Sequence, residues 1–111
     1  MGVGSIDIFS PLIKKSGNIL PKEEIDRLIN MGAVGDIGLQ FFDISGKKIN
    51  ISEKYKVIGM TLEQLKKANN AIVVAGGVHK VKAIIGALNT SAINTLITDP
   101  NTAKEIIKYV K

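Results

Sequence analysis

The sequence has no cysteine, no tryptophan and a single histidine, and these absences exclude several classes of function. Without cysteine, the chain cannot form a disulfide framework, a thiolate zinc site, an iron–sulfur cluster or a cysteine nucleophile. One histidine excludes a multi-histidine metal centre, so no metal or other cofactor is expected. Aromatic residues make up only 5% of the chain, which argues against a surface that stacks nucleic-acid bases.

Long hydrophobic runs are also absent. The longest uninterrupted one, Ala71 to Ala75, is far shorter than the roughly 20 residues that a membrane helix needs. The start of the chain has no basic leader, and Ile6 stands where a myristoylation signal has serine or threonine. The sequence therefore predicts a cytoplasmic protein without a membrane partner.

The chain has 111 residues, 45% of them hydrophobic, and a formal charge of +5. This length predicts one compact domain with one core. A mean hydropathy of +0.19 is high for a small soluble monomer, so we expect some apolar surface to meet a partner. The basic residues are spread out and almost all are lysine, which favours small acidic ligands such as phosphates over a dedicated nucleic-acid interface.

The first half of the sequence predicts one helix among strands. Pro21 starts the helix and Gly32 ends it, because proline suits the first helical position and glycine the end. Alternating apolar residues predict a single strand over 36–43, and Ser45-Gly46 then turns the chain into a β-hairpin. A short strand is also expected within 3–9.

The second half predicts repeated strand–helix units. A capping box opens a short helix at Thr61. Two apolar strands, over 71–75 and 93–98, are expected to be buried, the first with both faces covered, and a helix over 80–88 lies between them. Asp99 caps a last helix, over 102–110. Two strand–helix units in succession imply a parallel crossover and hence an α/β fold.

Two loops carry candidate binding residues. Gly76 and Gly77 follow a strand directly, so their amides and Lys80 in the next helix could hold an anion at a helix N-terminus. The alternative is a tight turn with a solvated lysine, and His79 is either an exposed turn residue or a catalytic base. In the second loop, Asp36 could accept hydrogen bonds from sugar hydroxyls while Gly35 lets the ligand approach. The alternative there is a carboxylate bonded to its own loop.

Other motifs are excluded. Gly2-Val3-Gly4-Ser5 resembles a dinucleotide fingerprint, but Asp7 stands at the wrong position and no strand precedes it. No phosphate-binding loop of nucleotide hydrolases occurs, and the spacing of the acidic residues selects no catalytic pair. No catalytic residue is therefore predicted.

Five motifs together resemble one family, in order and at compatible spacing. They are Gly32-Ala33-Val34-Gly35-Asp36, Phe41-Phe42-Asp43, Val57 to Leu65, Ala75 to Lys80, and Thr95 to Asp99. The chain is similar over nearly its whole length to the C-terminal half of the effector-binding domain of the SorC family, the bacterial sugar-responsive transcriptional regulators. The resemblance implies that residues 1–111 form a single domain that is part of a sugar-isomerase-like, Rossmann-like fold. This fold has a partly parallel sheet, flanking helices and a β-hairpin.

The resemblance also implies a function and a site. The domain binds a phosphorylated sugar without catalysing a reaction, and transmits binding through oligomer contacts. Asp36 corresponds to the acid that contacts the sugar, and Lys80 to the lysine that meets the phosphate. The complete ligand-binding set that we expect is Gly4, Ser5, Gly35, Asp36, Gly76, Gly77, His79 and Lys80.

Parts of the family's architecture are missing from this sequence. Neither the N-terminal helix-turn-helix nor the first half of the effector domain is present, so DNA would be bound only through an absent domain. We therefore expect a fragment that associates with itself or with the rest of a regulator. Two alternatives stay open: a small isomerase-like enzyme using Asp36 with His79 or Lys80, and a non-binding oligomerisation fragment.

Overall fold

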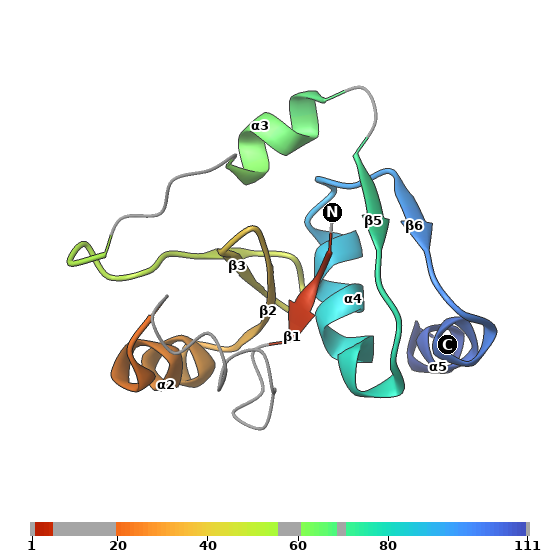
Figure 1. The fold of residues 1–111 in the computed structure, drawn as a ribbon, viewed down its shortest axis with the longest axis horizontal. Coiled ribbons are helices and arrows are strands. Elements are labelled where there is room, and N and C mark those ends of the chain that lie inside the picture. Colours follow the sequence, from red (N-terminus) through yellow and green to blue (C-terminus); the bar gives the residue numbers. More distant parts are fainter. Residues whose placement is uncertain (1, 6–19, 56–60, 69–70, 111) are drawn as a thin grey trace.

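The computed structural model describes residues 2–5, 20–55, 61–68 and 71–110, and it shows a mixed α/β fold (Figure 1). A four-stranded antiparallel sheet has the order β1-β2-β3-β4, and β5 and β6 form a separate parallel pair. The elements, in chain order, are β1 (Gly4–Ser5), α2 (Lys22–Asn30), β2 (Ala33–Ile37), β3 (Gln40–Asp43), β4 (Lys48–Ile49), α3 (Leu62–Lys67), β5 (Ile72–Val74), the 3-10 turn η1 (Val78–Lys80), α4 (Val81–Asn89), β6 (Thr95–Ile97) and α5 (Pro100–Val110).

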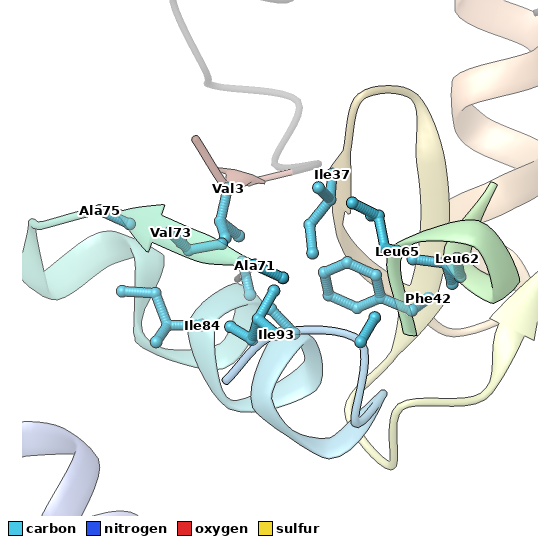
Figure 2. Close-up of a cluster of buried hydrophobic side chains, with 13 residues drawn as sticks. Val3, Ile37, Phe42, Leu62, Leu65, Ala71, Val73, Ala75, Ile84 and Ile93 are labelled. Carbon is cyan, nitrogen blue, oxygen red and sulfur yellow. The ribbon is translucent and has the colours of Figure 1, made fainter. Parts of the chain in front are cut away.

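Helix α4 lies at the centre of the fold, beside β1, β2 and β3 and next to α5 (Figure 1). Its apolar face joins the largest core cluster, in which Phe42 of β3, Val73 of β5 and Ile84 of α4 are fully buried (Figure 2). Gly86 allows this close approach, because a Cβ there would come within 2.7 Å of the Asp43 carbonyl oxygen. The helix therefore connects the two sheets through one shared core.

Helix α2 forms where the proline and glycine signals predict it. Pro21 precedes its first residue, and Gly32 follows its end with a φ of +98°, a conformation that glycine adopts without strain. Glu24 is buried in its first turn, forms an ion pair with Arg27 and accepts the backbone N–H of Ser52. These contacts fix α2 against the segment that follows β4.

The strand predicted over 36–43 is wrong as a single element. The chain instead forms β2 and β3, an antiparallel hairpin in which Ile37 pairs with Gln40 across a two-residue turn. Both turn residues have positive φ, +56° at Gly38 and +65° at Leu39, as a tight hairpin turn of this length requires. Leucine rarely adopts this conformation, so the alternating pattern conceals the turn.

Other predictions for this sheet are confirmed. The Ser45-Gly46 turn joins β3 to β4. The two strands pair antiparallel, with Phe41 of β3 opposite Ile49 of β4. Gly46 donates its N–H to the Asp43 carbonyl oxygen at 3.0 Å. The strand expected within 3–9 is present as β1, which pairs antiparallel with β2, and residues 6–9 lie outside the described part of the chain.

Strands β5 and β6 pair in parallel, as predicted. The burial predicted for the strand over 93–98 is wrong, whereas the exposed face of the pair agrees with the apolar surface expected from the mean hydropathy. In β5 only Val73 is buried, whereas Ile72 and Val74 are 43% and 57% exposed. Ile97 of β6, which pairs in register with Val74, is 52% exposed. Among the described residues, the core packs against only one face of this pair, so the opposite face is open and apolar.

Both predicted helix caps in the second half are confirmed. Thr61 accepts the Gln64 N–H at 3.1 Å while the Gln64 side chain accepts the Thr61 N–H at 2.8 Å, which completes the capping box of α3. Asp99 accepts the Thr102 N–H at 2.8 Å, and α5 begins at Pro100, two residues before the predicted start. No helix in the described ranges is long and apolar enough to cross a membrane.

Candidate functional site

Asp36 lies on β2 directly opposite Gly4 of β1. Its Oδ2 accepts the backbone N–H of Leu39 at 2.9 Å, which stabilises the hairpin turn. The other oxygen, Oδ1, lies so close to Gly4 that a Cβ built there would come within 2.3 Å of it. Glycine at position 4 therefore leaves room for the carboxylate over β1. The sequence allowed, as an alternative to ligand binding, that the Asp36 carboxylate bonds to its own loop. The bond from Leu39 is such a contact, and it uses only one of the two carboxylate oxygens.

Burial raises the pKa of Asp36 above its ordinary value. The Leu39 N–H and the positive charge of Lys80 act in the opposite direction but do not cancel the desolvation. Keeping this carboxylate ionised at neutral pH thus costs folding free energy. Asp36 is half-buried, and its ionised form does not stabilise the fold, so it is a candidate for binding a ligand.

Lys80 is the last residue of η1 and immediately precedes α4. This residue is half-buried, and its positive charge lowers the pKa of the Asp36 carboxyl without a direct ion pair between the two side chains. The turn η1 also contacts β1, the strand of Gly4 and Ser5. The structure therefore brings Gly4, Asp36 and Lys80 together from three separate elements.

The glycine loop before η1 differs from the predicted anion site. Gly77 has a φ of +115°. It donates its N–H to the Thr102 hydroxyl at 2.9 Å, so this amide has a partner within the protein. A 3-10 turn separates the loop from α4, and Lys80 occupies the N-cap position of that helix. The loop therefore does not lead directly into α4, and the Gly77 N–H is bonded within the protein, while the anion-binding role of Gly76, Gly77 and Lys80 stays a prediction.

Three other predicted residues have different surroundings. Gly35 is buried, and a Cβ there would meet the Gly4 carbonyl oxygen at 2.4 Å and the Ala83 Cβ at 2.6 Å. Gly35 therefore permits the close approach of β1 and α4, and its role beside a ligand stays a prediction. His79 is exposed, with its ring beside Gly77. Ser5 pairs with Gly35 at the edge of the sheet.

Sequence reasoning missed two threonines after β6: Thr98, which directly follows the strand, and Thr102 in the first turn of α5. Thr102 is fully buried, and its hydroxyl donates to Asp99 Oδ2 at 2.8 Å. The Thr98 hydroxyl is buried and forms no hydrogen bond within the described part of the chain. It lies near Gly76, 4.0 Å from a Cβ built there. The Asp-Pro-Asn-Thr sequence from Asp99 was a usable signal, since it places a hydroxyl in the first turn of a capped helix.

The described ranges hold no cluster of three or more side chains suited to a metal ion. An open groove lies elsewhere, against β3 and β4, and is lined in part by Phe41, Lys48 and Tyr55. None of the eight predicted binding residues lines this groove. The chemistry that the site offers is thus a carboxylate, a lysine and backbone groups beside glycines, an arrangement suited to a hydroxylated anion.

Comparison with known proteins identifies the class. Residues 1–108 match the family described as "Putative sugar-binding domain". The chain belongs to this family, the sugar-binding domain of SorC-type transcriptional regulators, as the five motifs predicted. The match spans nearly the whole chain and therefore includes all eight predicted site residues.

Two curated relatives show how much of a regulator the chain represents. The deoxyribonucleoside regulator of Bacillus subtilis is 39% identical over 85 residues, which cover 77% of this chain and 27% of that protein. The sorbitol operon regulator of Klebsiella pneumoniae is 32% identical over 111 residues, which cover 97% of this chain and 35% of that protein. The chain thus spans about a third of the length of these relatives.

Solved structures agree with the family assignment. The full-length sorbitol operon regulator SorC from Klebsiella pneumoniae superposes with a TM-score of 0.83 and 30% identity, over 96% of this chain and 33% of that one. A transcriptional regulator from Streptococcus pneumoniae TIGR4 gives a TM-score of 0.85 and 28% identity, over 98% of this chain and 41% of that one. The fold described above is therefore that of a segment of these regulators.

Proposed function

We propose that this chain forms part of the effector-binding module of a transcriptional regulator and contributes to a site for a phosphorylated sugar. The proposal rests on Asp36, a half-buried carboxylate beside Gly4, with the positive charge of Lys80, 44 residues later in the sequence, acting on it. Membership of the sugar-binding domain family supports the choice of a sugar.

The two side chains have complementary roles in this proposal. The Asp36 carboxylate accepts hydrogen bonds from sugar hydroxyls through the oxygen that Leu39 does not use. The Lys80 ammonium group binds the phosphate as a point charge at the start of α4, where the helix dipole also favours an anion. The net charge of +5 attracts the same class of ligand.

A thermal-shift panel tests the proposal. Hexose, pentose and triose phosphates are compared with their unphosphorylated parents on the 111-residue chain. Ligand at a hundred times its dissociation constant stabilises a protein by about 2.7 kcal/mol, which is many degrees of Tm for a domain of this size. Stabilisation by phosphorylated sugars alone supports the proposal, and the absence of a shift with every compound contradicts it.

The raised pKa of Asp36 favours one second candidate, an isomerase-like enzyme with this carboxyl as acid–base catalyst. The relatives are named as regulators rather than enzymes, which favours the binding module. Incubation with the same sugar phosphates, followed by NMR of the products, separates the two. Turnover that is lost in Asp36→Asn establishes an enzyme, whereas binding without turnover establishes the module.

We also propose that DNA contact in the complete regulator is made outside residues 1–111. Two observations support this: the chain spans about a third of its relatives' length, and its match is to the sugar-binding family. The ligand signal would then pass through contacts between this domain and other parts of the regulator or a second copy. The open face of β5 and β6 offers apolar surface for such contacts.

A further inference from the structure

A chain of hydrogen bonds runs from the start of α5 to the start of α4. Asp99 Oδ2 accepts the hydroxyl proton of Thr102 at 2.8 Å, and the oxygen of that hydroxyl accepts the Gly77 N–H at 2.9 Å. The Gly77 carbonyl in turn accepts the Lys80 N–H at 3.0 Å. Two segments 25 residues apart in the sequence are thereby connected at the carboxyl ends of β5 and β6.

The direction of each bond in this chain is fixed by chemistry. An ionised carboxylate only accepts, so the Thr102 hydroxyl must donate to Asp99 and is left with its lone pairs for Gly77. The N–H of Gly77 and the carbonyl of Gly77 are both engaged, so both peptide planes around this residue are held. Gly77 needs such support, because its φ of +115° is one of many conformations open to glycine.

Burial makes the Thr102 hydroxyl important. Its side chain is fully buried. If the hydroxyl were lost, the Gly77 N–H would lose its hydrogen-bond partner, and water could not readily take the place of the hydroxyl. The adjoining loop has little room to adjust, because a Cβ at Gly76 would come within 2.6 Å of Asp99 Oδ2. The glycine loop and the first turn of α5 thus pack as one unit.

We propose that Thr102 is a positioning residue of the ligand site: by holding the Gly77 peptide, its hydroxyl fixes the turn that places Lys80 beside Asp36. This inference rests on the proposed function, since the site is the same, and it adds the residue that determines the site's geometry. It also makes α5 part of the binding unit, so a shift of α5 changes where Lys80 lies.

The test compares Thr102→Val, which keeps the shape and removes the hydroxyl, with Thr102→Ser, which keeps the hydroxyl. Asn101→Ala, an exposed change in the same helical turn, is the matched control. The first measurement needs no ligand: titration of the Asp36 carboxyl by carbon-13 NMR. Because the charge of Lys80 lowers the pKa of Asp36, displacement of Lys80 raises its titration midpoint.

We expect the midpoint to rise in Thr102→Val and to stay at the wild-type value in Thr102→Ser and Asn101→Ala. The exchange rate of the Gly77 amide should increase at least tenfold in Thr102→Val and return toward the wild-type rate in Thr102→Ser. An unchanged midpoint in a folded Thr102→Val overturns the inference, whether or not any ligand is found.

If Thr102→Val does not fold, Asp99→Asn replaces it, because asparagine is an equally good helix cap. Faster Gly77 exchange in Asp99→Asn supports the inference, and an unchanged rate overturns it.

Ligand binding is the second measurement, with inorganic phosphate and the sugar phosphate that most stabilises the wild type. We expect affinity to fall about tenfold or more in Thr102→Val and to be retained in Thr102→Ser. Equal affinity in the wild type and Thr102→Val contradicts the positioning role. Failure of the wild type to bind either compound contradicts the proposed function instead, while the Asp36 titration still decides the role of Thr102.

Discussion

Asp36 Oδ1 lies over the α-carbon of Gly4, in space that any larger residue at position 4 would fill. The Gly4→Ala change places a methyl group within 2.3 Å of that oxygen, so the carboxylate must move. We expect affinity for the phosphorylated sugar to fall about tenfold, measured by calorimetry, with a small loss of stability. Gly2→Ala is the control, since a Cβ at Gly2 meets nothing within 4 Å. Equal affinity in the two variants would show that the carboxylate is not a ligand contact.

Asp36→Asn separates stability from binding. Burial raises the pKa of this carboxyl in the folded state above its pKa in the unfolded state. The free energy of unfolding therefore falls as pH rises from the unfolded-state pKa to the folded-state pKa. Asparagine avoids this cost while still accepting the Leu39 N–H. We expect the variant to have a higher Tm than the wild type at pH 7, the difference to shrink as pH falls through that window, and sugar-phosphate binding to be lost. If Asp36→Asn instead had a lower Tm than the wild type at pH 7, the ionised carboxylate would stabilise the folded state.

Glu24 shows the opposite pH dependence. The hydrogen bond from Arg27 is the largest cause that lowers the pKa of this carboxyl below its ordinary value near 4.5. Its stabilisation is therefore complete above that value and is lost as pH falls through the lower, folded-state pKa. We expect Glu24→Gln to lower the free energy of unfolding by about 1–2 kcal/mol at pH 7 and by much less in acid, measured by urea denaturation. Glu23→Gln, its exposed neighbour, should change stability by under about 0.5 kcal/mol. A loss that is the same at both pH values would exclude the ionised form as its source.

The open face of β5 and β6 predicts association of the isolated chain. Val74 and Ile97 lie side by side on it, each more than half exposed, and burying such a patch is favourable. We expect concentration-dependent association in sedimentation experiments, abolished by Val74→Lys. Leu88→Lys, a change at a 39% exposed position on α4, is the control and should leave association unchanged. A wild-type chain that stays monomeric at high concentration would contradict the prediction.

Local signals in the sequence predicted much of the fold. The capping box at Thr61, the proline and glycine around α2 and the cap at Asp99 each act within a few residues, so each is visible in the sequence. The turn between β2 and β3 was missed because Leu39 adopts a positive φ, which its residue type does not indicate. Its cost is offset by the Asp36 side chain, a contact known only from the folded hairpin.

Burial was harder to predict. An apolar run such as that over 71–75 suits a strand covered on both faces, but the run itself does not show whether both faces are covered, and in the described part of the chain Ile72 and Val74 are exposed. For the site, composition and spacing suggested Asp36 and Lys80 separately, and only the family resemblance joined them. The sequence around Asp99 places the Thr102 hydroxyl in the first turn of a capped helix, but its partner, Gly77, lies 25 residues away, so the bond between them could not be predicted locally.

The central claim is that Lys80 and Asp36 together bind a phosphorylated sugar, and calorimetry on a matched pair of lysine variants tests it most directly. Lys80→Ala removes the half-buried lysine at the site, and Lys82→Ala removes an exposed lysine two residues later with the same change in net charge. A charge-assisted hydrogen bond contributes about 1.5–3 kcal/mol, so we expect Lys80→Ala to bind the sugar phosphate about 10- to 100-fold more weakly. Lys82→Ala should bind like the wild type. Equal affinities in the two variants would contradict the account.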